Sequence, residues 1–454
     1  MSVDNTLALL LKGYAWLPAL SRRQGTRDGG PGADRPLRTR LLGHPVRVLR
    51  GPEAVAFFYD ERHARRGGAL PGPVLDTLFG RGAVHTLDGA RHRARKALFL
   101  SELTGPAAVA DLADRVTGEF RRRFDGLRGR EVTLFDEGAL VLARAVSDWA
   151  GLPGHDAAGV ERLGRDCVAM VDGFATAGPR HLRARRARAR QEETLRRAVV
   201  RARREASASA AGPPRTALEA VVRHREADGS LLDPATAAVE LLNIVRPTVA
   251  VTWFLTFAAH ALRPRPDVRR RLAADDAESA RLARSFAHEV RRFYPFVPFL
   301  GALAPDGLVL AGERVPPGTM LLLDVYGQNH DPALWDEPFR FVPDRFLAAA
   351  PHSDALIPQG GGPRDGHRCP GEDITVTVLS RLARELARLD FTVPDQDLRI
   401  PLNRVPTRPR DGFRLVVGPG GPRSAGSARP ERPERPVRPG GSERPGRTGH
   451  DRHP

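Results

Sequence analysis

The feature that most constrains this chain is a single cysteine at the end of a glycine-rich loop that runs into an apolar helix. The stretch QGGGPRDGHRCPGEDI covers residues 359 to 374 and contains Cys369. The only other cysteine among the 454 residues is Cys167, so a disulfide framework cannot be what holds the fold together. Cys369 therefore needs an explanation of its own.

The position of Cys369 favours a thiolate. Pro370 follows it, and proline is favoured at the first helical position, so the sequence predicts Cys369 as the N-cap of a helix that runs to about Leu389. A sulfur there faces unpaired backbone N–H groups and the positive end of the helix dipole. The glycines before it would let the backbone approach something bulky and flat; they are Gly360, Gly361, Gly362 and Gly366.

Three interpretations of Cys369 remain open at this point. A thiolate ligand to iron fits both the helix start and the glycines. A buried structural cysteine is the commoner fate of a lone cysteine. A catalytic nucleophile with a histidine partner is the third, but no hydrolase-like constellation accompanies it. Cys167, in GRDCVAMV, is expected to serve helix packing only.

The charge of the chain is strongly basic. Lysine and arginine number 71 against 54 acidic residues, which gives +17. Such a charge raises nucleic acid or an anionic membrane as partners. However, many of the arginines lie in residues 181–206, which predict a solvated helix with acidic residues interspersed, and few aromatic residues are available for stacking on bases. We therefore interpret the charge as a contribution to solubility and expect no nucleic-acid partner, with nucleic-acid binding as the weaker alternative.

The sequence predicts no integral membrane segment and a cytoplasmic location. The N-terminal apolar run, residues 7–11, is too short for a signal peptide or an anchor and has no basic region before it. Residues 240–262 are nearly all apolar, so a membrane span is the first alternative for them. Arg246 would cost roughly 2.5–3.5 kcal/mol in a bilayer, and Pro247 would free a carbonyl there. A core helix is the better interpretation.

The pattern of apolar residues predicts a mainly α protein with a minor β region. Short apolar runs cut by glycine and proline predict strands within residues 1–60 and 301–327. Helical periodicity dominates residues 90–300. We expect one domain over residues 1–417 and a disordered tail over 418–454, because the tail is rich in Pro, Gly and Arg and almost free of apolar residues.

Three motifs in this order resemble the cytochrome P-450 superfamily. The segment GHRCPGE resembles its haem-binding loop, in which the cysteine is the axial ligand of the iron. Glu289 and Arg292, in HEVRRFYP, match the E-x-x-R pair of the family, and Arg345, in FVPDRF, matches the arginine that completes a buried ionic triad. The resemblance covers residues 1–417. It implies the P-450 fold, haem b as cofactor between the oxygen-activation helix and the cysteine loop, and Cys369 as the metal ligand.

The resemblance also implies residues for the two haem propionates. His367 occupies a position that binds a propionate in the family. His92 and Lys96, in DGARHRARKALF, lie on one face of a predicted helix that resembles the propionate-contacting helix. The alternative for His92 and Lys96 is a solvated helix face, which such a basic chain makes plausible.

The oxygen-activation helix departs from the monooxygenase pattern. Conventional members carry an acid and an alcohol here, whereas this chain has Arg246 and Pro247. It therefore resembles the bacterial fatty-acid peroxygenase branch, which shares the Arg-Pro pair and the Gln-Gly-Gly-Gly entry to the cysteine loop. Residues 13–18 and 79–96 resemble that branch as well. The resemblance implies that Arg246 binds the carboxylate of a long-chain fatty acid, and a buried arginine does need an anionic partner.

This branch implies a mechanism in which the substrate supplies the missing acid/base group. A carboxylate held by Arg246 takes a proton from hydrogen peroxide, the co-substrate, and returns it to the distal oxygen. Arg246 and Pro247 are the expected catalytic residues of the helix. No obligatory reductase is then expected.

His85 bears on the product. Hydroxylating members of the branch typically carry glutamine at this position, whereas the alkene-forming member carries histidine, with a phenylalanine that matches Phe79. We therefore expect oxidative decarboxylation to terminal alkenes, with some α- or β-hydroxylation, and a proton donated by His85 because a histidine pKa lies near neutrality. A loop histidine that merely packs over the porphyrin is the alternative. For the whole chain, the alternatives are a conventional monooxygenase with redox partners and a non-catalytic haem-binding protein.

Overall fold

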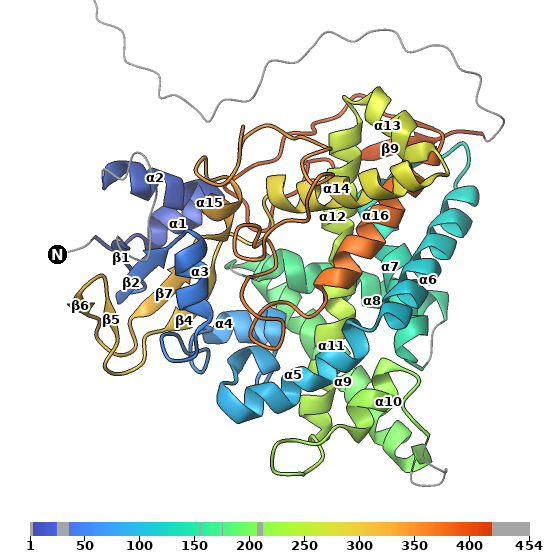
Figure 1. The fold of residues 1–454 in the computed structure, drawn as a ribbon. Helices are drawn as coiled ribbons and strands as arrows, with labels where there is room; N and C mark the ends of the chain where they lie inside the picture. Colours follow the sequence, from blue (N-terminus) through green and yellow to red (C-terminus); the bar gives the residue numbers. More distant parts are fainter. Residues whose placement is uncertain (1–2, 25–35, 154–155, 175, 207–211, 420–454) are drawn as a thin grey trace, which may run out of the picture. The chain divides into compact units, whose positions relative to one another are not determined.

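A four-stranded sheet joins the beginning of the chain to a segment 250 to 290 residues further on. The computed structural model describes residues 3–24, 36–153, 156–174, 176–206 and 212–419. The strand order is β1-β2-β7-β4, with β2 and β7 parallel and the other pairs antiparallel. The bounds are β1 Leu37–Leu41, β2 His44–Leu49, β4 Leu300–Leu303 and β7 Met320–Leu323. Both predicted strand regions are therefore confirmed, and Figure 1 shows this sheet at the left of the molecule.

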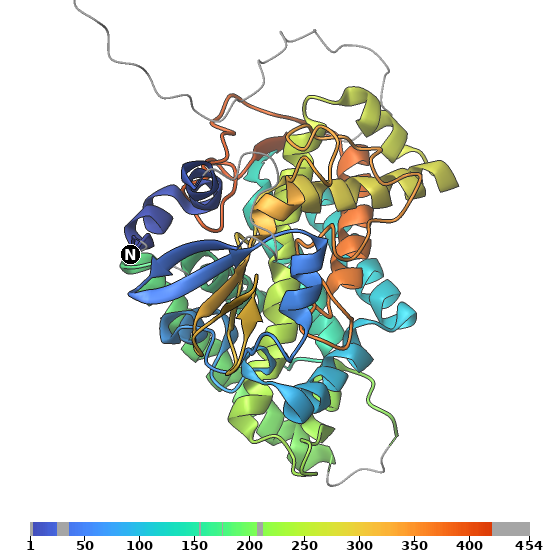
Figure 2. The same ribbon diagram turned by 60° about the vertical axis from the view of Figure 1, so that its left-hand side comes forward.

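Short helices cover the two faces of this sheet. Trp16 and Leu20 of α2 pack against Leu37 and Val46 on one face, whereas Val55 of α3 packs with Leu321 and Leu323 on the other. Figure 2 shows the sheet with α3 beside it. The elements around the sheet are α1 Thr6–Lys12, η1 Gly13–Ala15, α2 Trp16–Arg23, α3 Pro52–Tyr59, β5 Val309–Leu310, β6 Glu313–Arg314 and α15 Val325–Asn329.

Helices fill most of the chain between the two strand regions, as predicted. One large apolar core runs through them and contains the side chains of α6, α7, α11, α12, α14 and α16. Their bounds, with those of the neighbouring elements, are α4 Gly72–Val74, η2 Leu75–Phe79, η3 Val84–Thr86, α5 Gly89–Leu103, α6 Pro106–Asp125, α7 Leu134–Ala150, α8 Ala157–Gly173, α9 Pro179–Ala206, α10 Ala217–Arg223, α11 Pro234–Val249, α12 Val251–Leu262, α13 Pro266–Ala273, α14 Ala277–Phe293 and α16 Glu372–Arg388.

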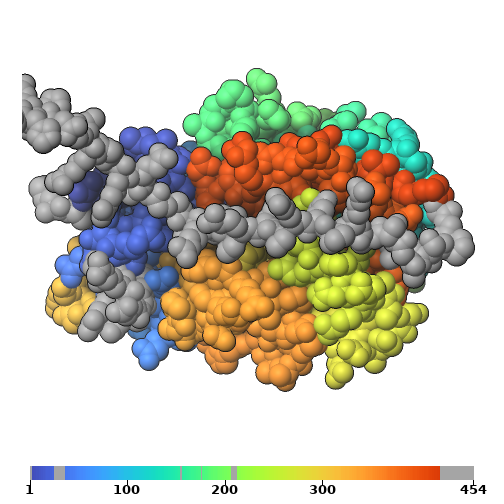
Figure 3. Space-filling model, turned by 90° about the horizontal axis from the view of Figure 1, so that it is seen from above, coloured from blue at the N-terminus to red at the C-terminus, as the bar shows by residue number. Residues whose placement is uncertain are grey.

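The C-terminal strands form a second sheet that the sequence patterns do not indicate. Its order is β3-β9-β8, and the bounds are β3 Glu131–Thr133, β8 Phe391–Thr392 and β9 Arg414–Val417. Strands of two to four residues are too short to carry a visible alternation of apolar and polar residues. Figure 3 shows the red C-terminal segment crossing one face between the orange segment and the green and cyan helices. The predicted disordered tail lies outside the described residues from 420 onward.

The apolar stretch predicted as one helix is divided into α11 and α12 at Ala250. Pro247 lies inside α11 and has no N–H to donate to the carbonyl of Asn243, which weakens the helix just before the break. Residues 234–262 are long and apolar enough to cross a membrane, but 94% of their most apolar window is buried inside the protein. This burial supports the interpretation as a core helix.

The long basic helix α9 is held together by ion pairs along its surface. Arg196 and Arg197 both pair with Glu193, and Arg201 pairs with Glu205. Spacings of three and four residues place these charges side by side on one face. The interspersed acidic residues are therefore confirmed, but only one face of the helix is solvated, because Arg188 and Val199 are buried on the other.

The predicted ionic triad is present on α14. Arg292 donates to both carboxylate oxygens of Glu289, at 2.7 and 2.8 Å, and Arg345 donates to Glu289 at 3.1 Å. Arg292 also donates to the carbonyls of Asn329 and Pro338. Glu289 and the Arg292 side chain are fully buried, so this pair ties α14 to the long loop that precedes the cysteine.

We expect Glu289→Gln to lower the free energy of unfolding by about 3–5 kcal/mol, because it leaves Arg292 as an uncompensated buried charge. Urea unfolding followed by circular dichroism measures this change. The matched control is Glu313→Gln, which breaks the Arg38 pair at the surface, where the side chains are 52% and 51% exposed. We expect less than about 1 kcal/mol there. Equal losses in the two variants would contradict a structural role for the triad.

Candidate active site between the cysteine loop and helix α11

Cys369 lies two residues before the N-cap of α16 and is not itself the cap. The helix begins at Glu372 with Gly371 as its cap, so the predicted helix start at Pro370 is wrong by two residues. The backbone N–H of Gly371 nevertheless donates to the sulfur, and the Gln359 amide lies 3.5 Å from it. These hydrogen bonds lower the pKa of the Cys369 thiol, whereas burial raises it by more.

The glycines of the loop have a packing role that the sequence did not indicate. A side chain at Gly360 or Gly362 would collide with Tyr59 of α3, and a side chain at Gly361 would collide with Val55. Gly360 and Gly362 also have φ values of 89° and 72°, which favour glycine. These glycines therefore let the loop pack closely on α3, and the predicted approach to a flat ligand stays a prediction.

Arg291 is a residue of the site that the sequence analysis missed. Its guanidinium donates to Gln359 at 3.0 Å and to Glu372 at 2.6 Å, and it contacts the Nδ1 atom of His288 at 3.1 Å. It is 1% exposed. Arg291 on α14 thus contacts both ends of the cysteine loop. In the sequence it directly precedes Arg292 of the E-x-x-R pair, and nothing else there indicates that it belongs to the site.

His92, Lys96 and His367 come together at one edge of this region. His92 and Lys96 lie on one face of α5 and are buried, at 1% and 3% exposure, so the alternative of a solvated helix face is wrong. The rings of His92 and His367 stack with centroids 3.8 Å apart. Lys96 donates to the carbonyl of Arg368, next to Cys369. Arg66, which the sequence analysis missed, joins them at 7% exposure.

The electrostatics of this cluster favour an anion. Burial lowers the pKa of His92 to about 4, of His367 to about 2 and of Lys96 to about 8, and neighbouring positive groups add to the shifts of both histidines. Arg66 Nη1, His92 Nδ1 and His367 Nε2 are buried atoms without a hydrogen-bond partner among the described residues. Buried unsatisfied donors beside like charges are costly. The two propionates of a haem would supply the missing acceptors and negative charge, so these residues fit that cofactor.

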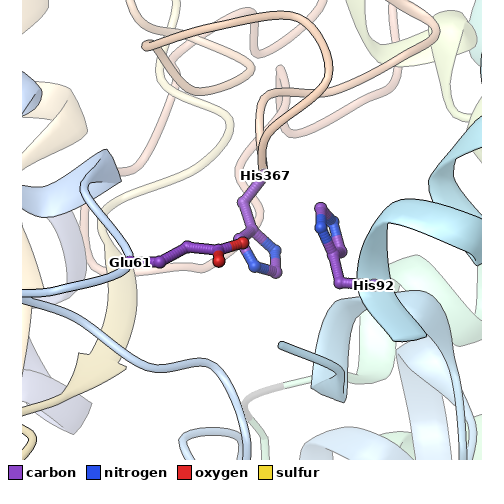
Figure 4. A group of neighbouring side chains, drawn as sticks. All are labelled: Glu61, His92 and His367. Carbon is purple, nitrogen blue, oxygen red and sulfur yellow. The ribbon is translucent and has the colours of Figure 1, made fainter. Parts of the chain in front are cut away.

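The same edge includes one carboxylate. Possible ligand atoms of Glu61, His92 and His367 lie within 4.8 Å of one another, and Figure 4 shows how the three side chains lie. The two imidazole rings are stacked, however, rather than directed at a common point. Glu61 also pairs with Arg93 at 3.2 Å, and buried Lys96 is a neighbour of His92. These cations disfavour a divalent metal ion at this place.

Arg246 is a buried cation without an ionic partner. It is 6% exposed, and burial lowers its pKa to about 9. Its Nη2 atom donates to Asn243 Oδ1 at 3.2 Å, and its Nε atom has no partner. Within the described part of the chain, no carboxylate lies at ion-pair distance from it. The expected anionic partner is therefore not supplied by a described residue.

Phe79 and His85 lie together beside Arg246. The guanidinium of Arg246 is 5.8 Å from the centre of the Phe79 ring, and the rings of Phe79 and His85 are 4.4 Å apart. The charge of Cys369 contributes to the pKa of Arg246, which indicates that the cysteine loop and this group face the same region. Two sequence segments separated by 160 residues thus build one site.

In the protein alone, His85 does not have the near-neutral pKa that was expected for a proton donor. Burial, followed by repulsion from Arg246, lowers the pKa of His85 to about 3, so its imidazole is neutral near pH 7. Its Nδ1 atom is buried without a partner. An anion bound to Arg246 would remove that repulsion and raise the pKa of His85.

Pro247 has the only exposed side chain in the buried stretch from Leu241 to Ala250. Its ring is accessible, whereas the residues on either side of it in this stretch are buried. The hydroxyl groups further along α11 and α12 are all engaged with carbonyls: Thr248 donates to Ile244, Thr252 to Phe135 and Thr256 to Thr252. These three threonines thus offer no free hydroxyl for relaying protons.

Glu240 and Asn243 connect the parts of this site and were both missed. Glu240 is fully buried and accepts from Arg95 at 2.6 Å and from the backbone N–H of Val84 at 2.7 Å. Asn243 donates to the carbonyl of Phe79 at 2.9 Å. Their positions in the apolar helix, six residues before Arg246 for Glu240 and three for Asn243, were the one signal that could have found them.

Cys167 on α8 has no chemical partner of its own. It is fully buried, and burial raises the pKa of its thiol to about 12. Such a thiol is unreactive. This agrees with the expected packing role.

Comparison with known proteins agrees with this arrangement. The family model for cytochrome P450 matches residues 263–413. A structure of P450SP alpha (CYP152B1) in complex with (R)-ibuprophen is 37% identical, covers 92% of this chain and 100% of that chain, and has a TM-score of 0.84. A structure of an OleT variant in complex with arachidonic acid is 32% identical and has a TM-score of 0.84. The match covers 92% of this chain and 97% of that chain.

Curated relatives match over shorter stretches. Cytochrome P450 137 of Mycobacterium tuberculosis is 29% identical over 211 residues, which are 44% of this chain and 43% of that protein. The human cytochrome P450 4A11 is 35% identical over 131 residues, which are 28% of this chain and 24% of that protein. The chain thus matches less than half of the length of these curated relatives.

We expect Arg66→Gln to release haem at least about 10-fold faster than the wild type, because a charge-assisted hydrogen bond contributes about 1.5–3 kcal/mol. Transfer of haem to apomyoglobin measures the rate. Arg62→Gln is the control, since the Arg62 side chain is 84% exposed and pairs only with Asp60. Identical rates in the two variants would remove Arg66 from the cofactor edge.

Proposed function

Since the chain belongs to the cytochrome P450 family, in the branch of P450SP alpha and OleT, we propose that it oxidises long-chain fatty acids with hydrogen peroxide. One observation carries the proposal: the Arg246 guanidinium is buried in α11 without a carboxylate partner among the described residues. A buried charge of this kind is costly unless an anion meets it. The substrate carboxylate would be that anion.

The ligands named for the two structural relatives support this choice. Arachidonic acid is bound to the OleT variant and (R)-ibuprophen to P450SP alpha, and both molecules are carboxylic acids. A guanidinium matches a carboxylate with two parallel hydrogen bonds. The unpartnered Nε atom of Arg246 would provide one of them. The Phe79 ring beside the guanidinium would bound the head of the substrate.

The cofactor would be haem b, held by the cysteine loop and by the buried basic side chains at one edge of the site. Cys369 would ligate the iron, and Arg66, His92, Lys96 and His367 would bind the propionates. Among the described residues, a buried nitrogen of Arg66, of His92 and of His367 lacks a hydrogen-bond partner. When bound, haem with a thiolate ligand supplies the chemistry that cleaves peroxide and oxidises C–H bonds. The side chain of Pro247, which is exposed within an otherwise buried stretch of α11, would limit the room above it.

The acid/base group would come from the substrate. The neighbouring threonine hydroxyls of α11 and α12 are bonded to backbone carbonyls, so they are poor proton relays. A carboxylate held by Arg246 would take a proton from hydrogen peroxide and return it to the leaving oxygen atom. Anchoring the carboxylate also fixes the α and β carbons as the nearest reacting positions. No reductase is required for this sequence of proton transfers.

His85 would influence which product forms. It is neutral in the protein alone, and the substrate carboxylate on Arg246 would raise its pKa. A histidine that gains a proton in this way becomes a donor near the α and β carbons. We therefore propose oxidative decarboxylation to terminal alkenes together with α- and β-hydroxylation.

We expect Arg246→Ala to lower kcat/KM for a long-chain fatty acid with peroxide by at least about 100-fold, equivalent to about 2.7 kcal/mol, while haem content is kept. Arg246→Lys is the matched variant, and we expect intermediate activity because lysine keeps the charge but not the paired hydrogen bonds. Gas chromatography with mass spectrometry identifies the products. Full turnover by Arg246→Ala would refute the carboxylate anchor.

The same assay separates the alternatives. A conventional monooxygenase would be silent with peroxide and active with reduced nicotinamide and a ferredoxin system. A non-catalytic haem-binding protein would turn over with neither oxidant.

His85→Gln tests the product assignment. We expect a shift from alkene towards hydroxy acid, because glutamine cannot deliver a proton. The alkene-to-hydroxy-acid ratio of the two enzymes, measured at equal conversion, provides the comparison. An unchanged ratio would leave His85 as a packing residue.

A further inference from the structure

Asn243 lies between a buried carboxylate and the proposed substrate-binding arginine. Its Nδ2 atom donates to Glu240 Oε2 at 3.2 Å and to the carbonyl of Phe79 at 2.9 Å, while its Oδ1 atom accepts from Arg246 Nη2 at 3.2 Å. Asn243 is 5% exposed, Glu240 0% and Arg246 6%. The three residues thus form one buried chain of hydrogen bonds along α11.

The partners of Asn243 fix the orientation of its amide. The two N–H donors face a carboxylate and a carbonyl, and the oxygen faces a guanidinium. Reversal of the amide would place N–H groups against Arg246 and an oxygen against two other oxygens, which leaves all three contacts unsatisfied. The amide dipole is therefore aligned so that its negative end faces Arg246.

Glu240 lies at the end of this hydrogen-bond chain that is opposite to Arg246. Its Oε1 atom accepts from Arg95 and from the backbone of Val84, the residue before His85. Arg95 is 1% exposed and also pairs with Glu226. The carboxylate of Glu240 is therefore paired with Arg95, which it shares with Glu226, and the neutral amide of Asn243 lies between Glu240 and Arg246.

This arrangement solves a specific physical problem. An arginine that must bind a carboxylate needs to stay charged and fixed inside the protein, which requires polar partners. A protein carboxylate beside it would satisfy those needs but would compete with the substrate. A neutral amide supplies an acceptor and leaves the net positive charge of the guanidinium available.

We propose that Asn243 is a positioning residue that keeps Arg246 oriented and free of a counterion, so that the site selects carboxylates over neutral amphiphiles of equal length. This inference rests on the proposed function, because it assigns a role towards the same fatty-acid carboxylate. Through the carbonyl of Phe79, Asn243 also fixes the ring that borders the guanidinium. Glu240 acts on the site through Asn243 and through the backbone before His85.

Replacement of the amide by a carboxylate tests this role directly. Asn243→Asp keeps the shape and gives Arg246 an internal counterion. Isothermal titration of the haem-loaded protein, without peroxide, measures the affinity for hexadecanoic acid and hexadecan-1-ol at about pH 8, where free carboxyl groups are ionised. We expect the Kd for the acid to rise at least about 10-fold and the Kd for the alcohol to change less than about 3-fold.

Two further variants complete the experiment. Thr256→Val removes a buried hydroxyl of the adjoining helix α12 that bonds only to Thr252, and we expect both Kd values to stay at the wild-type level. Asn243→Ala removes the restraint without adding charge, and we expect a loss of acid affinity of about 3-fold or more with the alcohol unaffected. This variant decides the question if Asn243→Asp does not fold or bind haem.

The outcomes separate the inference from the proposed function. Wild-type protein that binds neither ligand would contradict the proposed function itself. Wild-type protein that prefers the acid, together with Asn243 variants that keep this preference, would overturn the role of Asn243 alone. Equal losses for acid and alcohol would also overturn it, because they indicate general damage to the pocket.

Discussion

The rest of the site depends on one unpaired buried charge, that of Arg246. Burial opposes this charge strongly enough to lower the pKa of the guanidinium to about 9, and its nearest polar partner is the neutral amide of Asn243. Proteins rarely leave such a group without an anion. The nearby polar groups do not supply this anion, because Glu240 pairs with Arg95 and the hydroxyl of Thr248 is bonded to its own helix. The guanidinium of Arg246 is therefore a buried cation that is available to bind a carboxylate.

A second region of the interior has the same character. Around the cysteine loop, Arg66, His92, Lys96 and His367 converge without an anion apart from Glu61 and Asp88, which have other partners. His85 is influenced by both regions, because the charges of Arg246 and Lys96 both lower its pKa. One region suits the carboxylates of a cofactor and the other the carboxylate of a substrate. The fold therefore offers one place for the carboxylates of a cofactor and a different place for the carboxylate of a substrate.

Residues in short linear motifs could be predicted from the sequence, whereas residues that act through distant contacts could not. Glu289 and Arg292 are three residues apart on one helix, and their spacing alone brings them together. Glu240 meets Arg95 across 145 residues, and Asn243 meets Phe79 across 164, so no local pattern announces either contact. The glycines of the loop were found, but their packing on α3 could not be predicted, because Tyr59 lies about 300 residues earlier in the chain. The neutral state of His85 follows from burial, which only the three-dimensional structure reveals.

The most direct test of this account is a crystal structure of the haem-loaded protein with a long-chain fatty acid. The account predicts Cys369 as the iron ligand and the fatty-acid carboxylate at about 2.7–2.9 Å from the nitrogen atoms of Arg246, with Asn243 still accepting from the other side of the guanidinium. A fatty acid bound with its carboxylate away from Arg246, for example on the exposed arginines of α9, would contradict it.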